Sequence, residues 1–90
     1  MYALVREILD TGKENGVDII VARDMVVAKG KDFKEVDAAY KIIDTYYDTI
    51  TFFNRTGNEA GIETVCNLYA EGKKSELKEF IKTVREENNH

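Results

Sequence analysis

The stretch that decides the fold is DFKEVDAAYKIIDTYYDTITFFN, residues 32–54, which contains two apolar stripes at helical spacing and neither glycine nor proline. The first stripe steps by four and three residues, as side chains on one helix face do, and consists of Val36, Tyr40, Ile43, Tyr47 and Ile50. The second runs beside it and consists of Ala39, Ile42, Tyr46 and Phe53. Because two adjacent stripes require cover on two sides, we predict one long helix at the centre of a helical bundle.

Local signals mark both ends of this helix. Asp32, with Glu35 three residues later, resembles a capping box in which Asp replaces the usual Ser or Thr. The sequence Arg55-Thr56-Gly57 breaks the pattern. The helix should therefore run from Asp32 to about Asn54, a length of roughly 33 Å at about 1.5 Å per residue.

Further helices are expected on either side of the long one, because six glycines and no proline favour helices joined by short turns. We expect a first helix over Tyr2–Glu14 that stops at Gly16, a fourth from Asn58 or Glu59 to Glu71, and a fifth over Ser75–Glu86. Their expected buried positions are Val5, Ile8, Leu9 and Gly12, then Ile62, Val65, Cys66 and Tyr69, then Leu77, Phe80, Ile81 and Val84.

The segment VDIIVARDMVVA, residues 17–28, supports two interpretations. As a helix it begins at Asp18 and buries a stripe of Val17, Ile20, Val21, Met25 and Ala28. As a hairpin it turns at Arg23-Asp24, which lacks the glycine or asparagine that a tight turn favours. We prefer the helix, because an isolated two-stranded ribbon is marginally stable. The predicted fold is an all-α, single-domain bundle of four or five helices over residues 1–90, and the alternative is α+β with a short hairpin at 17–28.

The composition is that of a small folded domain, with 43% hydrophobic and 33% charged residues. The net charge of −4 argues against nonspecific attraction to nucleic acid or to an anionic membrane. The single cysteine, Cys66, cannot form an internal disulfide, and no apolar run approaches the ~20 residues that cross a bilayer. The first residues also lack a secretory signal. We therefore expect a cytoplasmic protein with no membrane partner.

No set of residues points to catalysis, to a cofactor or to a metal site. The only histidine is His90, where we expect no packed structure to hold it. Cys66 thus lacks a histidine partner, and we interpret it as a small apolar core residue. Asp37, Asp44 and Asp48 recur along the predicted long helix, and we interpret them as a solvated face. We expect the protein not to be an enzyme, and a metal-dependent enzyme is the third and most distant hypothesis.

Aromatic side chains crowd the second half of the long helix, namely Tyr40, Tyr46, Tyr47, Phe52 and Phe53. Core packing is the simpler interpretation of these rings. The alternative is an interface, because tyrosine combines an apolar body with a polar tip and is enriched where proteins meet. We predict a small protein-binding module, such as an adaptor, inhibitor or regulatory subunit, whose aromatic helical surface docks another protein or a second copy of the chain in a homodimer.

Two lysine clusters support a second hypothesis, a small nucleic-acid-binding regulator. Lys29, Lys31 and Lys34 surround one turn, and Lys74, Lys78 and Lys82 follow at intervals of four residues. Glutamates at 71, 76, 79 and 86 dilute the second cluster, so a mixed solvated surface is the simpler interpretation. A helix-turn-helix over Val17–Tyr46 would also place two acidic residues at the start of its recognition helix. Nucleic acid is therefore the less favoured partner.

Overall fold

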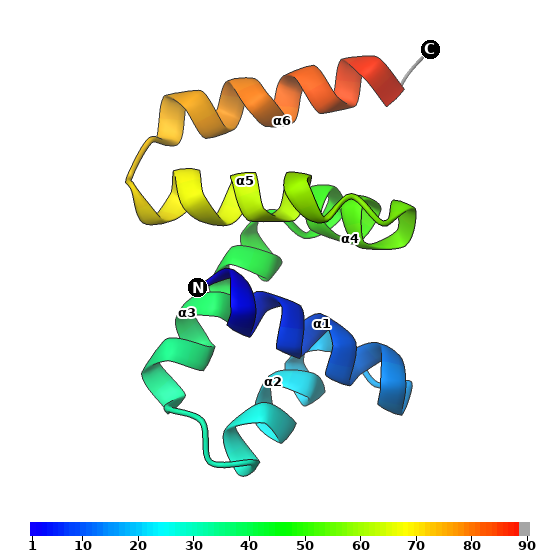
Figure 1. Ribbon diagram of the computed structural model, residues 1–90, viewed down its shortest axis with the longest axis vertical. Helices are drawn as coiled ribbons and strands as arrows, with labels where there is room; N and C mark the ends of the chain where they lie inside the picture. The colour runs from blue at the N-terminus through cyan, green and yellow to red at the C-terminus, as the bar shows by residue number, and fades with distance from the viewer. Residues whose placement is uncertain (89–90) are drawn as a thin grey trace.

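The computed structural model describes residues 1–88, with only the backbone of residue 88, and this range contains six helices (Figure 1). They are α1 (Tyr2–Asn15), α2 (Ile19–Ala28), α3 (Phe33–Thr45), α4 (Tyr47–Thr56), α5 (Glu59–Ala70) and α6 (Lys74–Asn88). The prediction of an all-α fold is confirmed. No strand occurs in residues 1–88, so the hairpin alternative at 17–28 is wrong. None of the helices in this range is both long and apolar enough to cross a membrane.

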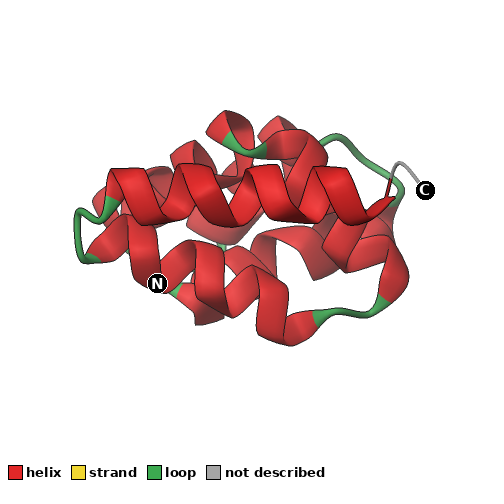
Figure 2. Ribbon diagram, turned by 90° about the horizontal axis from the view of Figure 1, so that it is seen from above, coloured by secondary structure: helices red, strands yellow, loops and turns green. Residues whose placement is uncertain are grey.

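The helices form two groups along the long axis of a molecule that measures 40 × 27 × 17 Å. In the first group α1, α2 and α3 pack on one another, and in the second α5 contacts both α4 and α6. A contact between α1 and α5 joins the two groups. Figure 2 shows that short loops connect the helices, as the absence of proline and the spacing of the glycines predicted.

The predicted long helix is in fact two helices, because the chain bends at Tyr46. The backbone there has φ −114° and ψ 38°, although hydrogen bonds from Tyr46 N–H to the Ile42 carbonyl and from Ile50 N–H to the Tyr46 carbonyl persist at 3.1 and 2.9 Å. The apolar stripes on either side of the bend face different neighbours: α3 packs against α1 and α2, whereas α4 packs against α5. A single straight helix would not reach both groups, so the described residues contain one helix more than expected.

The expected buried faces of α1, α5 and α6 agree with the structure except at Tyr69. The buried positions are Val5, Ile8, Leu9 and Gly12 in α1, Ile62, Val65 and Cys66 in α5, and Leu77 in α6, with Phe80, Ile81 and Val84 partly buried. Tyr69 was expected to be buried, but it is 38% exposed, because it lies at the edge of the core against the ring of Tyr46.

The helix preferred for residues 17–28 is correct, but its predicted buried face is wrong. The expected stripe is half-buried at Val17 and Met25 and exposed at Ile20, Val21 and Ala28. The buried residues of α2 are Ala22 and Val26, and Ala22 lies so near Gly12 of α1 that a Cβ added to Gly12 would be 3.6 Å from the Ala22 Cβ. Because α2 is apolar on all sides, its periodicity does not identify the face that meets α1.

The cap at Asp32 acts as predicted, whereas the helical segment continues two residues beyond the predicted end at Asn54 and includes Arg55 and Thr56. The Asp32 carboxylate accepts a hydrogen bond from the Glu35 N–H at 3.1 Å and caps α3. At the other end, α4 stops at Gly57, which adopts the left-handed φ of 74° that a side chain would disfavour. Asn58 then caps α5 by accepting from the Gly61 N–H at 2.9 Å.

Arg6 of α1 connects the two groups of helices. Its guanidinium donates to Asp10 of the same helix at 3.0 Å, to Glu59 Oε1 at the start of α5 at 2.6 Å, and to the side-chain oxygen of Asn54 in α4. The Tyr2 hydroxyl donates to the other carboxylate oxygen of Glu59. The Tyr2 hydrogen bond, followed by the interactions with Arg6, lowers the pKa of Glu59 below its usual value. These contacts hold α1 against the facing ends of α4 and α5.

Candidate docking surfaces

Two adjacent tyrosines at the bend between α3 and α4 line one hollow together beside Arg85, and each also lines a larger groove that the other does not. Tyr46 is half-buried, and its ring meets that of Tyr69 edge-on, with centroids 6.2 Å apart and an interplanar angle of 79°. Tyr47 is 51% exposed and lines a groove that α1 also borders. The two rings, which were predicted to lie in adjacent stripes of one helix, thus reach different grooves.

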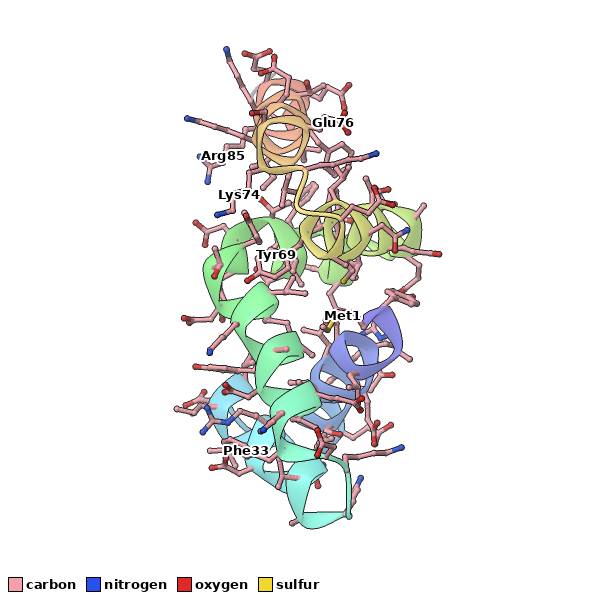
Figure 3. All side chains as sticks on the ribbon, turned by 90° about the vertical axis from the view of Figure 1, so that its left-hand side faces the viewer. Met1, Phe33, Tyr69, Lys74, Glu76 and Arg85 are labelled. Carbon is pink, nitrogen blue, oxygen red and sulfur yellow. The ribbon has the colours of Figure 1, made fainter. Side chains whose placement is uncertain are left out.

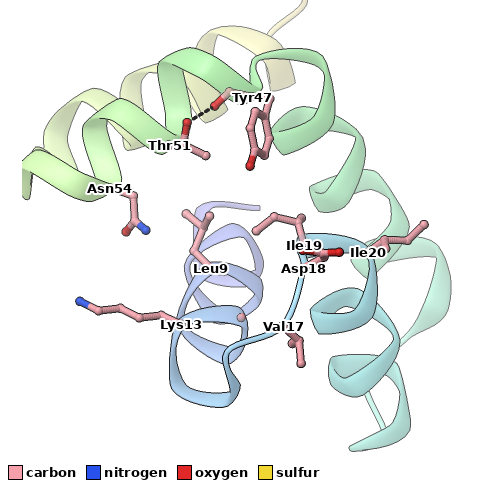
Figure 4. A pocket seen from close by; sticks show the side chains of 10 residues that line it. Leu9, Lys13, Val17, Asp18, Ile19, Ile20, Tyr47, Thr51 and Asn54 are labelled. Atoms are coloured by element: carbon pink, nitrogen blue, oxygen red, sulfur yellow. Dashed lines mark hydrogen bonds between the residues drawn. The ribbon is translucent and has the colours of Figure 1, made fainter.

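The first hollow, which we call the Tyr47 groove, lies between α1, the start of α2 and α4 (Figure 4). Its volume of about 460 Å³ falls within the range of ligand and peptide pockets. Leu9, Val17 and Ile19 supply its apolar surface, and Figure 4 shows the side chains of Leu9, Ile19 and Tyr47 around its centre. Ile20, which is 48% exposed, lies at its edge.

Polar side chains surround the apolar centre of the Tyr47 groove. Lys13 and Asp18 contribute one positive and one negative group to its lining, and neither forms an ion pair within residues 1–88. The Thr51 hydroxyl donates to the Tyr47 carbonyl at 2.7 Å, which satisfies this donor within α4 (Figure 4). The groove therefore combines apolar and polar lining, and the charges of Lys13 and Asp18 have no ion-pair partner among the described side chains.

The other three rings of the predicted interface lie outside this groove. Phe53 is 2% exposed and packs with Phe80 at a centroid distance of 6.0 Å, so it belongs to the core and is not available to a partner of the folded chain. Tyr40 is half-buried under the Arg23 guanidinium, 4.7 Å from the ring centroid. Phe52 is also half-buried. Of the five predicted rings, Tyr47 alone is exposed.

The second hollow, which we call the α6 groove, lies between α6 and the bend at Tyr46 and has a volume of about 590 Å³. Four cationic side chains line it together with Thr45, Tyr46 and Ile81; they are Lys74, Lys78, Lys82 and Arg85. Figure 3 shows Lys74 and Arg85 on one side of α6 and Glu76 on the other. No glutamate is among the residues that line this groove, although the glutamates at 79 and 86 are within one turn of Lys82 in α6.

The first lysine cluster lies far from the second. Lys29, Lys31 and Lys34 surround the loop between α2 and α3, at the opposite end of the molecule from α6 (Figure 1). Lys31 Nζ lies 3.9 Å from a carboxylate oxygen of Glu7 in α1. The two clusters therefore do not form one continuous basic surface.

Two of the groups considered for catalysis or metal binding, Cys66 and Asp37, are respectively buried and ion-paired. Cys66 is 1% exposed, and burial raises the pKa of its thiol to about 11, so the thiol is protonated at neutral pH. Asp37 forms ion pairs with Lys41 at 3.3 Å and with Arg23 at 3.8 Å. Within residues 1–88 no cluster of three His, Cys, Asp or Glu side chains is placed to hold a metal ion. His90 lies outside the described residues.

Sequence reasoning missed two parts of these surfaces. Leu9 and Ile19 come from helices distant from Tyr47 in the sequence, so no local pattern indicates the Tyr47 groove. Arg85 was noted near the second lysine cluster but not assigned to it, although the helical period places it on the same side of the helix, one turn after Lys82. Projection of residues 74–88 onto a helix would have shown this.

Comparison of the chain with protein-family models, with curated proteins and with solved structures gives no match. Function therefore has to be inferred from the geometry of the two grooves.

Proposed function

We propose that this protein is a protein-binding module that receives an apolar part of its partner in the Tyr47 groove. The observation that carries the proposal is the exposure of Tyr47 and Ile20, 51% and 48%, at a groove whose centre is apolar. Removal of apolar surface from water contributes about 25 cal/mol per Å², so a partner that covers these side chains gains affinity from them. Tyrosine is also among the residues that contribute most to interface energies.

The framework of the Tyr47 groove supports this proposal. Leu9 is 3% exposed and belongs to the core, and α1 approaches α2 closely at Gly12. A groove whose base is part of a packed core needs little ordering when a partner binds, which lowers the entropic cost of association. Lys13 and Asp18 at the margin would orient the partner by complementary charges.

An adaptor, an inhibitor and a regulatory subunit would each use such a surface, and the partner is either another protein or a second copy of the chain. The module would act in the cytosol, where the free thiol of Cys66 stays reduced.

Substitutions that remove the exposed side chains of the groove test this proposal. We expect Tyr47→Ser and Ile20→Ser to release a protein that the wild-type chain captures from its native host, with helix content unchanged by circular dichroism. Phe33→Ser is the matched control, because Phe33 is 58% exposed and does not line the groove.

Light scattering over a wide concentration range identifies the kind of partner. A wild-type dimer that Tyr47→Ser converts to a monomer would mean that a second copy occupies the groove. Capture or dimerisation that neither groove substitution weakens would contradict the proposal.

A further inference from the structure

Four cations of α6 lie on one side of the helix. At about 100° per residue, Lys74, Lys78, Lys82 and Arg85 fall within a sector of about 80°, next to the sector of the buried Leu77 and half-buried Ile81. The glutamates at 76, 79 and 86 lie outside this sector, although those at 79 and 86 are within one turn of Lys82 at its outer edge. All four cations line the α6 groove, and none of these glutamates does.

These four cations lack an ion-pair partner inside the described chain. None of them forms an ion pair with a carboxylate in residues 1–87, although Lys31, Lys41 and Lys73 do. Lys74, Lys78 and Lys82 are spaced so that each repels the next, and like charges four residues apart destabilise a helix. A binding partner with negative charges would relieve this repulsion.

The α6 groove also has an apolar side. Ile81 and the ring of Tyr46 line it beside the row of cations, and the Tyr69 ring holds Tyr46 in place. A complementary ligand needs a row of negative charges next to a row of apolar groups. An amphipathic helix meets this requirement, because its carboxylates four residues apart repeat at about 6 Å, as the lysines of α6 do.

We propose that the α6 groove binds an acidic amphipathic helix of a partner protein. The carboxylates of that helix would face Lys74, Lys78 and Lys82, and its apolar residues would cover Ile81 and Tyr46. This surface is separate from the Tyr47 groove, so the proposal does not depend on the one made above.

Two observations favour an acidic helix over nucleic acid in the α6 groove. Asp44 and Asp48 line an adjoining hollow together with Arg85 and would repel a phosphate backbone that continued beyond the groove. The other lysine cluster lies at the far end of the molecule and cannot extend the contact (Figure 1).

The test uses fluorescence anisotropy with three labelled probes at low ionic strength. The first is a helical peptide of about 18 residues with adjacent stripes of glutamate and leucine, long enough to follow the basic row. The second has the same composition in scrambled order, and the third is a single-stranded oligonucleotide. We expect the ordered peptide to bind most tightly, and affinity to fall as salt rises.

Charge reversal locates the contact. Lys78→Glu should weaken binding of the ordered peptide by roughly tenfold or more, because like charges would then face each other. Lys34→Glu makes the same change in net charge at the other end of the molecule and should leave the affinity unchanged. Ile20→Ser, which removes a side chain that lines the Tyr47 groove and neither hollow beside α6, should also leave it unchanged, which separates this proposal from that of the Tyr47 groove.

Tighter binding of the oligonucleotide would overturn the proposal in favour of a nucleic-acid surface. Equal binding of the scrambled peptide would overturn the requirement for a helix, and equal losses in Lys78→Glu and Lys34→Glu would overturn the location. Absence of binding by the ordered peptide at low salt would overturn the proposal as a whole.

Discussion

Phe53 presents its ring to the backbone of Gly61, so closely that a Cβ added at residue 61 would lie 2.8 Å from Cε2 of the ring. Two further ring carbons would lie at 2.9 Å. This approach joins α4 to α5, and because Phe53 also packs with Phe80, it brings α6 into the same part of the core. The absence of a side chain at Gly61 is therefore a condition for the packing of the second group of helices.

Gly61→Ala should lower the free energy of unfolding by about 1–3 kcal/mol, because the added methyl displaces a buried ring. This loss should exceed the gain of about 1 kcal/mol that alanine otherwise brings to a helix interior. Urea denaturation followed by circular dichroism measures the change. Combination with Phe53→Leu should cost less than the sum of the two single substitutions, since the smaller side chain leaves room for the methyl. A stabilised Gly61→Ala variant would contradict this account of the contact.

Phe53→Ala and Tyr47→Ala should differ strongly although both remove a ring from α4. Phe53 is 2% exposed, and its truncation should lower the free energy of unfolding by about 3–5 kcal/mol. Tyr47 is 51% exposed, so its truncation should cost about 1 kcal/mol or less. Thermal and urea denaturation compare the two variants directly. Similar losses in both would mean that Tyr47 belongs to the core.

Glu59→Gln should weaken the connection between the two groups of helices in a pH-dependent way. The pKa of Glu59 is lowered in the folded protein from its usual 4.5, so the stabilisation it provides is present above that value and is lost as pH falls through the folded-state pKa. Because the carboxylate is 49% exposed, we expect a difference from wild type of only about 0.5–1 kcal/mol at pH 7.

This difference should shrink as pH falls below 4.5 and disappear once the pH is below the folded-state pKa of Glu59, where the carboxyl is protonated in both states. Denaturation curves at a series of pH values measure it, with Glu79→Gln on the exposed side of α6 as control. A difference that stays constant from neutral to acidic pH would show that the ion pair of Glu59 with Arg6 is not its source.

Cys66 should react slowly with a thiol reagent such as Ellman's reagent while the chain is folded. The side chain is 1% exposed, so the reagent has little access to the sulfur. Burial also raises the pKa of the thiol to about 11, so little of the reactive thiolate is present at neutral pH. Reaction should become fast in denaturant, which serves as the internal control. Equal rates with and without denaturant would place Cys66 at the surface.

Strong local signals in the sequence were enough to predict the helices. The prediction was wrong where contacts between distant segments determine the position of a helix end or a bend. Asp32 and Gly57 act as predicted, because a cap and a left-handed glycine depend only on neighbouring backbone. The bend at Tyr46 has neither glycine nor proline to mark it. Residues 45–53 are mostly β-branched and aromatic residues of modest helix propensity, and packing of α3 and α4 on different partners decides where the helix breaks.

The candidate surfaces were predictable only in part. Tyr47 was proposed as an interface residue and is exposed, whereas Phe53 was proposed with it and is buried. The two residues lie on different sides of α4, and the stripes in residues 32–54 do not reveal that α5, with Gly61 against the Phe53 ring, covers only one of these sides. The buried face of α2 was also not predictable from its sequence, as the exposed Ile20 and buried Ala22 show. Apolar residues occur on every side of this helix, so their spacing does not specify which side is buried.

The measurement that tests the central claim most directly is photocrosslinking in the native host, with p-benzoylphenylalanine in place of Tyr47 and, separately, in place of Phe33. The account predicts a covalent adduct of one defined mass from position 47 and none from position 33, with twice the mass of the chain if the partner is a second copy. Absence of an adduct at position 47, or the same adducts at both positions, would contradict docking in the Tyr47 groove.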